Sequence, residues 1–243
     1  MLAVVRMFLV VTISIIICIF GVIYCLFNPR DPSHVSFFGR LFGCMAPIFG
    51  IQVEIRQLLF TAIPKNCIYV ANHQNNYDMV TVAYVVQPRT ITVGKRSLLW
   101  IPLFGLLYWL SGNLLINRSN SIKSHRMLYR IIQNIKKYDI SVCIFPEGTR
   151  SRGRGLLPFK KGAFYAAISA GVPIVPICVS NLSGDKIRLN RWSNGSVIIE
   201  ILPPIETTNY TIKEVDIVTD NCYILMKNKI EELNQEVMLR DSC

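Results

Sequence analysis

The stretch Cys67-Ile-Tyr-Val-Ala-Asn-His-Gln-Asn-Asn-Tyr-Asp78 places an apolar, partly β-branched run directly before a polar loop. A short apolar run followed by turn residues predicts a buried strand, here over residues 67–71, and Asn75 and Asn76 favour a turn after it. Similar runs recur along the chain and predict further strands at residues 90–93, 113–116, 140–145, 174–179 and 196–202.

Helical patterns separate several of these strands. The clearest covers residues 122–137, where apolar side chains recur at helical spacing and most basic side chains fall on other faces. A second helix is expected over 161–170, stopped by Gly171, and a long charged one over 213–240, with a possible break at 220–221. The alternation predicts an α/β domain with a largely parallel sheet flanked by helices.

Composition limits the classes of partner. The chain of 243 residues is 51% hydrophobic and 17% charged, and its formal net charge is +11. Positive charge on an apolar chain favours an anionic substrate, anionic membrane lipids or an acidic carrier protein. We expect no nucleic acid, because no basic-and-aromatic platform or recognition motif occurs. The 8 cysteines include no Cys-x-x-Cys pair and no Cys/His cluster with zinc spacing, so no metal site is predicted.

The N-terminal region predicts a membrane anchor. Residues 7–27 carry no charge, and as a helix they reach about 30 Å, the thickness of the bilayer hydrocarbon. A signal peptide has a shorter apolar stretch and a small-residue cleavage site, whereas Asn28-Pro29-Arg30 follows here. Arg6 and Arg30 flank the stretch on both sides, so the positive-inside rule leaves its orientation open.

A second apolar segment, residues 37–51, contains Arg40 and Pro47 and is too short and interrupted to span comfortably. It predicts an interfacial or re-entrant helix. The predicted division is therefore a membrane anchor over residues 1–51 and a catalytic domain over 52–243.

The candidate general base is His73. Of the three histidines, His34 lies in the connection after the anchor and His125 in a basic helix, whereas His73 follows a strand, where α/β sheets bind their ligands. Five positions separate His73 from Asp78, about 140° apart on one α-helix. The two side chains therefore meet only if His73 is in the loop and Asp78 is in or near the first helical turn.

In that arrangement the Asp78 carboxylate accepts a hydrogen bond from one imidazole nitrogen and leaves the other free to take a proton. The sequence contains no G-x-S-x-G nucleophile elbow, which disfavours an α/β-hydrolase. A histidine–aspartate pair without its own serine would act on the hydroxyl of a substrate.

Two basic segments are candidates for phosphate binding. In Phe145-Pro-Glu-Gly-Thr-Arg-Ser-Arg-Gly-Arg-Gly155, arginines combine with glycines that let a ligand approach the backbone. Gly94-Lys95-Arg96-Ser97 precedes an apolar stretch that ends before Asn117-Arg118. For residues 145–155 the alternative is a solvated basic loop, or one that lies on anionic lipid headgroups. For residues 98–110 the alternative is a core or membrane-facing helix.

Together these motifs resemble the glycerolipid acyltransferase family. The H-x4-D pair, the two basic segments and Val172-Pro-Ile-Val-Pro-Ile177 occur in the order and at the spacing of that family, and the resemblance covers the whole chain. It implies direct acyl transfer from acyl carrier protein or acyl-CoA to the sn-2 hydroxyl of 1-acyl-sn-glycerol-3-phosphate (lysophosphatidic acid), giving phosphatidic acid without a metal or redox cofactor. It also implies a place in the bacterial inner membrane, with the catalytic domain facing the cytoplasm.

The resemblance also implies roles for single residues. His73 would be the general base and Asp78 its orienting acid. The substrate-binding residues would be Lys95, Arg118, Glu147, Gly148, Thr149 and Arg150, with the three cations on the acceptor phosphate and Glu147 in an orienting role. Many relatives have Asp-Arg where this chain has Asn117-Arg118, which puts a carboxylate role there in doubt.

Two rival functions remain at this point. A sibling enzyme acylating glycerol-3-phosphate or another lysophospholipid would share the histidine–aspartate pair. A non-catalytic protein binding anionic membranes would share the basic loop. A transporter is disfavoured because the sequence has only one clear span.

Overall fold

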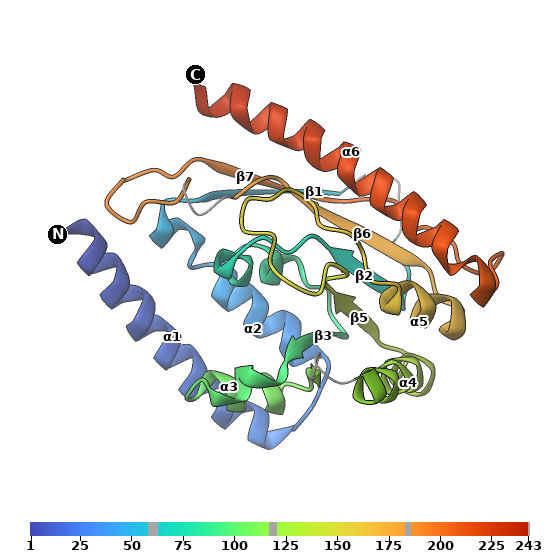
Figure 1. Cartoon of the computed structure of the whole chain (residues 1–243). Helices are drawn as coiled ribbons and strands as arrows, with labels where there is room; N and C mark the ends of the chain where they lie inside the picture. Colours follow the sequence, from blue (N-terminus) through green and yellow to red (C-terminus); the bar gives the residue numbers. More distant parts are fainter. Residues whose placement is uncertain (58–62, 117–120, 183–185, 243) are drawn as a thin grey trace.

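A mixed β-sheet forms the centre of the protein (Figure 1). The computed structural model describes residues 1–57, 63–116, 121–182 and 186–242. In these residues the sheet has 7 strands in the order β1-β7-β6-β2-β5-β3-β4. The strands are β1 (Gln52–Gln57), β2 (Ile68–Ala71), β3 (Thr90–Lys95), β4 (Leu114–Ile116), β5 (Ser141–Ile144), β6 (Ile174–Val179) and β7 (Ser196–Ile201).

The predicted largely parallel sheet is confirmed. Strands β6, β2, β5, β3 and β4 all run in one direction, and β7 and β1 run the opposite way at one edge. In the centre, Ile68 pairs with Val142 on one side and with Ile174 on the other. The central strands β2 and β6 are buried along their whole length, which explains their uninterrupted apolar sequences.

Strand β1 was not predicted from the sequence. Within the described residues it is an edge strand that pairs with β7, and its residues are half-buried at Val53, Glu54 and Arg56 and exposed at Gln52, Ile55 and Gln57. Its charged residues Glu54 and Arg56 conceal the strand pattern, because an edge strand needs only one buried face. Arg56 donates two hydrogen bonds, of 2.6 and 2.7 Å, to the carboxylate of Glu236 and thereby ties β1 to the C-terminal helix.

Helices cover both faces of the sheet (Figure 1). One apolar core includes side chains of α1 and α3 with Tyr69 and Ile177, and the other includes side chains of α4, α5 and α6 with Ile68 and Ile174. Alternate residues of each central strand thus face opposite cores. The helices are α1 (Leu2–Phe27), α2 (Ser33–Gly43), α3 (Phe104–Leu110), α4 (Ser121–Tyr138), α5 (Gly162–Ala170) and α6 (Val215–Ser242).

Helices α4 and α5 lie within one residue of their predicted bounds, but the predicted break at 220–221 is wrong. Helix α6 runs through this position without interruption. Val218, Cys222 and Met226 are buried at intervals of four residues, so packing against the sheet maintains the helix there.

The N-terminal helix starts earlier than predicted, at Leu2, and therefore contains Arg6. The Arg6 guanidinium is buried and donates to the backbone oxygens of Leu189, Arg191 and Trp192. These acceptors satisfy the charged group, so it does not terminate the apolar helix. In the described residues, α1 is the one helix long and apolar enough to cross a membrane.

The second apolar segment, residues 37–51, is divided between two helices and is not the single helix predicted. Helix α2 begins at Ser33, so His34 belongs to its first turn, and a short 3₁₀ helix η1 (Ala46–Phe49) follows. The stretch 98–110 is also divided, into η4 (Arg96–Trp100) and α3, with Pro102 between them. Leu103, at a φ of 61°, makes the turn into α3.

We expect Leu233→Ala to lower the free energy of unfolding by about 2–5 kcal/mol, because this side chain of α6 is fully buried and its loss leaves a cavity. Leu225→Ala makes the same change on the same helix, where the side chain is 42% exposed, and should cost less than about 1 kcal/mol. Chemical denaturation in detergent measures both values. Equal losses would contradict the placement of α6.

Candidate active site

His73 and Asp78 meet at the end of strand β2. His73 lies in the loop after Ala71, and Asp78 lies in the first turn of a 3₁₀ helix, η2 (Asn76–Met79). Imidazole Nδ1 and carboxylate Oδ2 are 2.6 Å apart. Asn75 caps η2 by accepting a hydrogen bond of 2.8 Å from the backbone N–H of Tyr77. This is the arrangement that the five-residue spacing required.

The loop backbone holds the Asp78 carboxylate in place. The same Oδ2 atom accepts from the backbone N–H groups of Gln74, at 2.8 Å, and Asn75, at 3.3 Å. The Asp78 side chain is only 5% exposed, so these bonds act with little competition from water. A carboxylate that accepts from Nδ1–H fixes the tautomer with its free lone pair on Nε2.

The ring of His73 is held flat against Phe145. The two ring centroids are 4.2 Å apart and the planes differ by 25°. Within the described residues no hydrogen bond occupies Nε2, and the His73 side chain is 16% exposed. A fixed ring with a free, accessible nitrogen can accept a proton from a bound hydroxyl.

Three amide side chains beside His73 connect its loop to the end of β6. Asn72 donates to the Val179 carbonyl and accepts from the Val179 N–H, both at 2.9 Å. Gln74 donates to the Val179 and Ser180 carbonyls, at 3.0 and 2.9 Å, and Asn75 donates to the Leu182 carbonyl. Sequence reasoning missed this supporting role of Asn72 and Gln74. Their polarity next to a buried strand was the available signal, because a buried amide needs partners.

Glu147 joins the histidine loop to the basic loop. Its Oε1 accepts from the His73 backbone N–H at 2.6 Å, and its Oε2 accepts from the Leu157 N–H at 3.0 Å. The residue is 3% exposed, and this burial raises the pKa of its carboxyl, while the two N–H donors act in the opposite direction. With both oxygens occupied by backbone groups, Glu147 positions the loops.

Backbone hydrogen bonds complete the contact between these loops. The Ser151 N–H donates to the His73 carbonyl at 2.8 Å, and the Arg152 N–H donates to the Gln74 carbonyl at 3.0 Å. Arg150 therefore directly precedes Ser151, whose backbone N–H donates to the His73 carbonyl. It is half-buried, and within the described chain its Nε has no hydrogen-bond partner.

The other predicted substrate-binding residues are less closely connected. Gly148 has a φ of 70°, and a side chain there would collide with the end of Lys160, whereas Thr149 is exposed. Lys95 is exposed at the end of β3, and the register of β3 with β5 places it near the level of Pro146. Arg118 lies outside the described residues.

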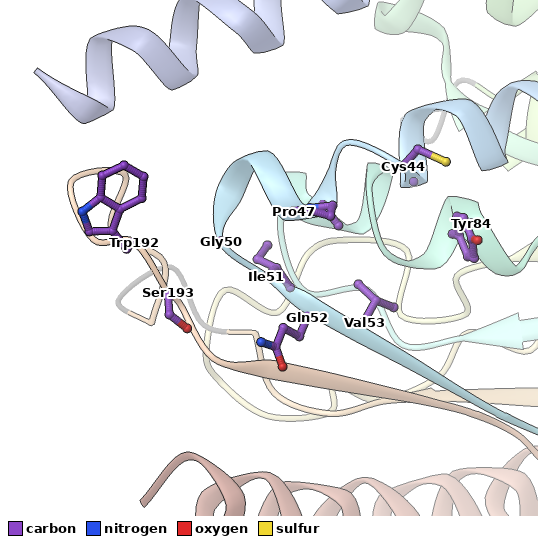
Figure 2. A pocket seen from close by; sticks show the side chains of 11 residues that line it. Cys44, Pro47, Gly50, Ile51, Gln52, Val53, Tyr84, Trp192 and Ser193 are labelled. Atoms are coloured by element: carbon purple, nitrogen blue, oxygen red, sulfur yellow. The ribbon is translucent and has the colours of Figure 1, made fainter.

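The site has no cluster of metal ligands in the described part of the chain. A pocket of about 530 Å³ lies elsewhere, between η1, the start of β1 and Trp192 (Figure 2). The residues lining it include Cys44, Ile51 and Tyr84 and none of the predicted site residues. Phe49 of η1, which does not line the pocket, has its ring 5.2 Å from that of Tyr77 in η2.

The site thus combines an imidazole whose Nε2 is free within the described residues, a buried carboxylate behind it and an adjoining loop rich in arginine. Residues 52–180 match the protein family described as Acyltransferase, and the chain belongs to this family. It is an enzyme that transfers acyl groups.

Individual relatives match over almost the whole chain. The 1-acyl-sn-glycerol-3-phosphate acyltransferase of Salmonella typhimurium is 56% identical over 242 residues, which cover 100% of this chain and 98% of the relative. The enzyme of the same name from Escherichia coli is 55% identical and covers 100% and 99%. The crystal structure of the 1-acyl-sn-glycerophosphate acyltransferase PlsC of Thermotoga maritima has the same fold, with a TM-score of 0.74, 24% identity and coverage of 96% and 95%.

We expect Asp78→Asn to lower acyl-transfer activity by about 10²–10⁴-fold, because an amide favours the wrong imidazole tautomer and cannot balance the imidazolium. Asp220→Asn, on the exposed side of α6, is the matched control and should retain wild-type activity. Release of free thiol from the acyl donor measures the rate, and circular dichroism checks folding. A folded Asp78→Asn protein with undiminished activity would remove Asp78 from the mechanism.

Proposed function

We propose that the protein transfers an acyl chain from acyl carrier protein or acyl-CoA to the sn-2 hydroxyl of 1-acyl-sn-glycerol-3-phosphate, giving phosphatidic acid. The observation that carries the proposal is the His73–Asp78 pair, with Nε2 free, bonded through the backbone to the arginine-rich loop. The printed names of the relatives support this acceptor.

The proposed reaction has two steps. His73 Nε2 removes the proton of the acceptor hydroxyl while its oxygen attacks the carbonyl carbon of the thioester. Asp78 stabilises the imidazolium that forms. The tetrahedral intermediate then collapses, the C–S bond breaks, and the imidazolium returns its proton to the leaving thiolate. Atoms and charges balance without a metal or redox cofactor.

Direct transfer is favoured over an acyl-enzyme because the nearby cysteines are poor nucleophiles. Cys67 immediately precedes β2 and Cys143 lies on β5, the strands that lead into the two active-site loops, and both cysteines are buried. Burial raises the pKa of Cys67 to about 11 and that of Cys143 to about 12. Because the thiolate is the reactive form, neither side chain supplies a nucleophile at neutral pH.

The acceptor phosphate is assigned to the basic side chains at the same edge of the sheet. Arg150 directly precedes Ser151, which bonds to the backbone of His73, and within the described residues its Nε has no hydrogen-bond partner. Lys95 lies at the end of β3, which pairs with β5. Arg118 completes the proposed set. The Glu147–Arg150 turn, including Gly148 and Thr149, shapes the approach of the phosphate, because glycine leaves the backbone accessible.

The membrane role is proposed for α1 and the neighbouring α3 region. The most apolar 18-residue window of α1 has a mean hydropathy of 2.9, and only 22% of it is buried. Trp109 on α3, which packs on α1, and Trp100 on η4, which packs on α3, are exposed, as expected for side chains at a lipid interface. We place the enzyme in the bacterial inner membrane, in contact with anionic lipids, with its active site facing the cytoplasm.

Identification of the product lipid tests the proposed function. Detergent-purified protein is incubated with a labelled acyl donor and, separately, with lysophosphatidic acid, glycerol-3-phosphate and lysophosphatidylcholine. We expect labelled phosphatidic acid from the first acceptor and none above background from the others. His73→Ala sets the background, with about 10²–10⁴-fold less product. Preferential labelling of another acceptor would overturn the assignment.

We expect Arg150→Gln to raise the KM for lysophosphatidic acid by about ten- to a hundredfold, because one charge-assisted phosphate contact is lost. The KM for acyl-CoA should remain nearly unchanged. Arg152→Gln, an exposed position in the same loop, is the matched control for a nonspecific charge effect. A normal KM and kcat for the acceptor in Arg150→Gln would exclude the phosphate contact.

A further inference from the structure

Helix α4 carries a row of basic side chains that the proposed chemistry does not use. Its buried side includes Met127, Ile131 and Ile135, which pack in the core shared with α5 and α6. Its sequence, SIKSHRMLYRIIQNIKKY, contains no acidic residue. Arg126, Arg130, Gln133 and Lys137 are exposed. At 100° per residue they lie within about 60° of one another around the helix, and we call them the basic face of α4.

Ion pairs in the described part of the molecule do not account for the basic face, although Lys137 Nζ lies 5.1 Å from the centre of the Tyr138 ring. Within the residues that the structure describes, no ion pair joins Arg126, Arg130 or Lys137 to a carboxylate. Other cations, such as Lys161 and Lys229, do pair with acidic neighbours. Arg126 and Arg130 are like charges four positions apart, which destabilises an isolated helix. The repulsion between these two side chains disfavours the folded helix, and a role in binding a partner explains why both are present.

Helix α4 is separated from the active-site loop, residues 145–161, by α5. Helix α5 follows this loop directly and packs on α4, where a side chain at Gly162 would lie 3.3 Å from the Leu128 methyl. At 100° per residue Leu128 lies on the side of α4 opposite Arg126 and Arg130, so the basic face points away from α5. The loop contributes further exposed cations, Arg152, Arg154 and Lys160. The Arg152 N–H donates to the Gln74 carbonyl, next to His73, so this loop brings positive charge close to the active site.

We propose that the basic face of α4 docks an acidic carrier protein that bears the acyl group as a thioester. The inference rests on the proposed function. Of the two proposed donors it selects the carrier protein, which would dock on the enzyme outside the active site. A carrier protein presents its thioester on a long flexible arm, so it binds beside the active site. Charge complementarity at such a surface accelerates association and is weakened by salt.

The position of α4 favours a soluble partner over a lipid surface. Helix α1, with its exposed apolar side chains, packs on α2, α3 and η1 and belongs to the core on the opposite face of the sheet from α4 (Figure 1). The large apolar side chains that α4 exposes in the described residues are Tyr129 and Tyr138. A bilayer that receives α1 therefore does not face α4.

The test compares two donors with the same acyl chain, palmitoyl-acyl carrier protein and palmitoyl-CoA. We expect the double variant Arg126→Glu, Arg130→Glu to lower kcat/KM for the carrier-bound donor about tenfold and to reduce its salt dependence. The value for palmitoyl-CoA should change less than about twofold. Arg130→Glu alone should have a smaller effect of the same kind, and Lys227→Glu, an exposed position on α6, is its matched control and should have none.

Three results would overturn the proposal: no loss with the carrier protein, equal losses with both donors, or a loss only of binding to phosphatidylglycerol vesicles. Binding of the full-length protein to immobilised holo-carrier protein, measured by surface plasmon resonance, is independent of turnover. If the wild-type protein made no phosphatidic acid, the proposed function would fail. Charge-dependent binding of the carrier protein would still support the docking surface, and its absence would reject it.

Discussion

The site depends on the two hydrogen bonds that the buried carboxylate of Glu147 accepts. One oxygen holds the backbone of the histidine loop and the other holds the backbone of the basic loop, two segments more than 70 positions apart. Neither loop is part of a strand, and each extends beyond the carboxyl end of its own β-strand. A charged acceptor that binds two backbone donors in a poorly solvated position is much stronger than a surface contact. His73 and the basic loop are thereby fixed relative to each other.

The parallel sheet supplies the other condition for this geometry. Strands β2, β5 and β6 are adjacent and parallel, so their carboxyl ends meet at one edge. Strand β2 leads into the histidine loop and β5 leads into the basic loop. Strand β6 ends at Val179, whose carbonyl accepts hydrogen bonds from the side chains of Asn72 and Gln74. The base is therefore supported from both neighbouring strands. A rigid frame of this kind keeps a catalytic ring in place without relying on the substrate.

Much of this could be predicted from the sequence where local signals dominate. Strand β6 was predicted with its exact bounds because both of its faces are buried, and the spacing of His73 and Asp78 allowed only one way for them to meet. Long-range partners escaped prediction. The carbonyls that bind Gln74 lie more than 100 positions away, and nothing in the local pattern identifies them. Strand β1 escaped because Glu54 and Arg56 find partners on α6, which only the folded chain provides.

The buried Arg6 also constrains the order of assembly. It lies in the first helix to be synthesised, but the three carbonyls that bind it belong to residues 189–192, which are among the last quarter of the chain to be made. Until then its guanidinium has no partner from this loop, and the apolar side chains of α1 are covered only where the helix packs on α2, η1 and α3. A nascent chain with such a helix needs an apolar environment during translation. The N-terminal end of the first helix is thus among the last parts of the chain to be fixed in place, because the partners of Arg6 belong to the C-terminal quarter.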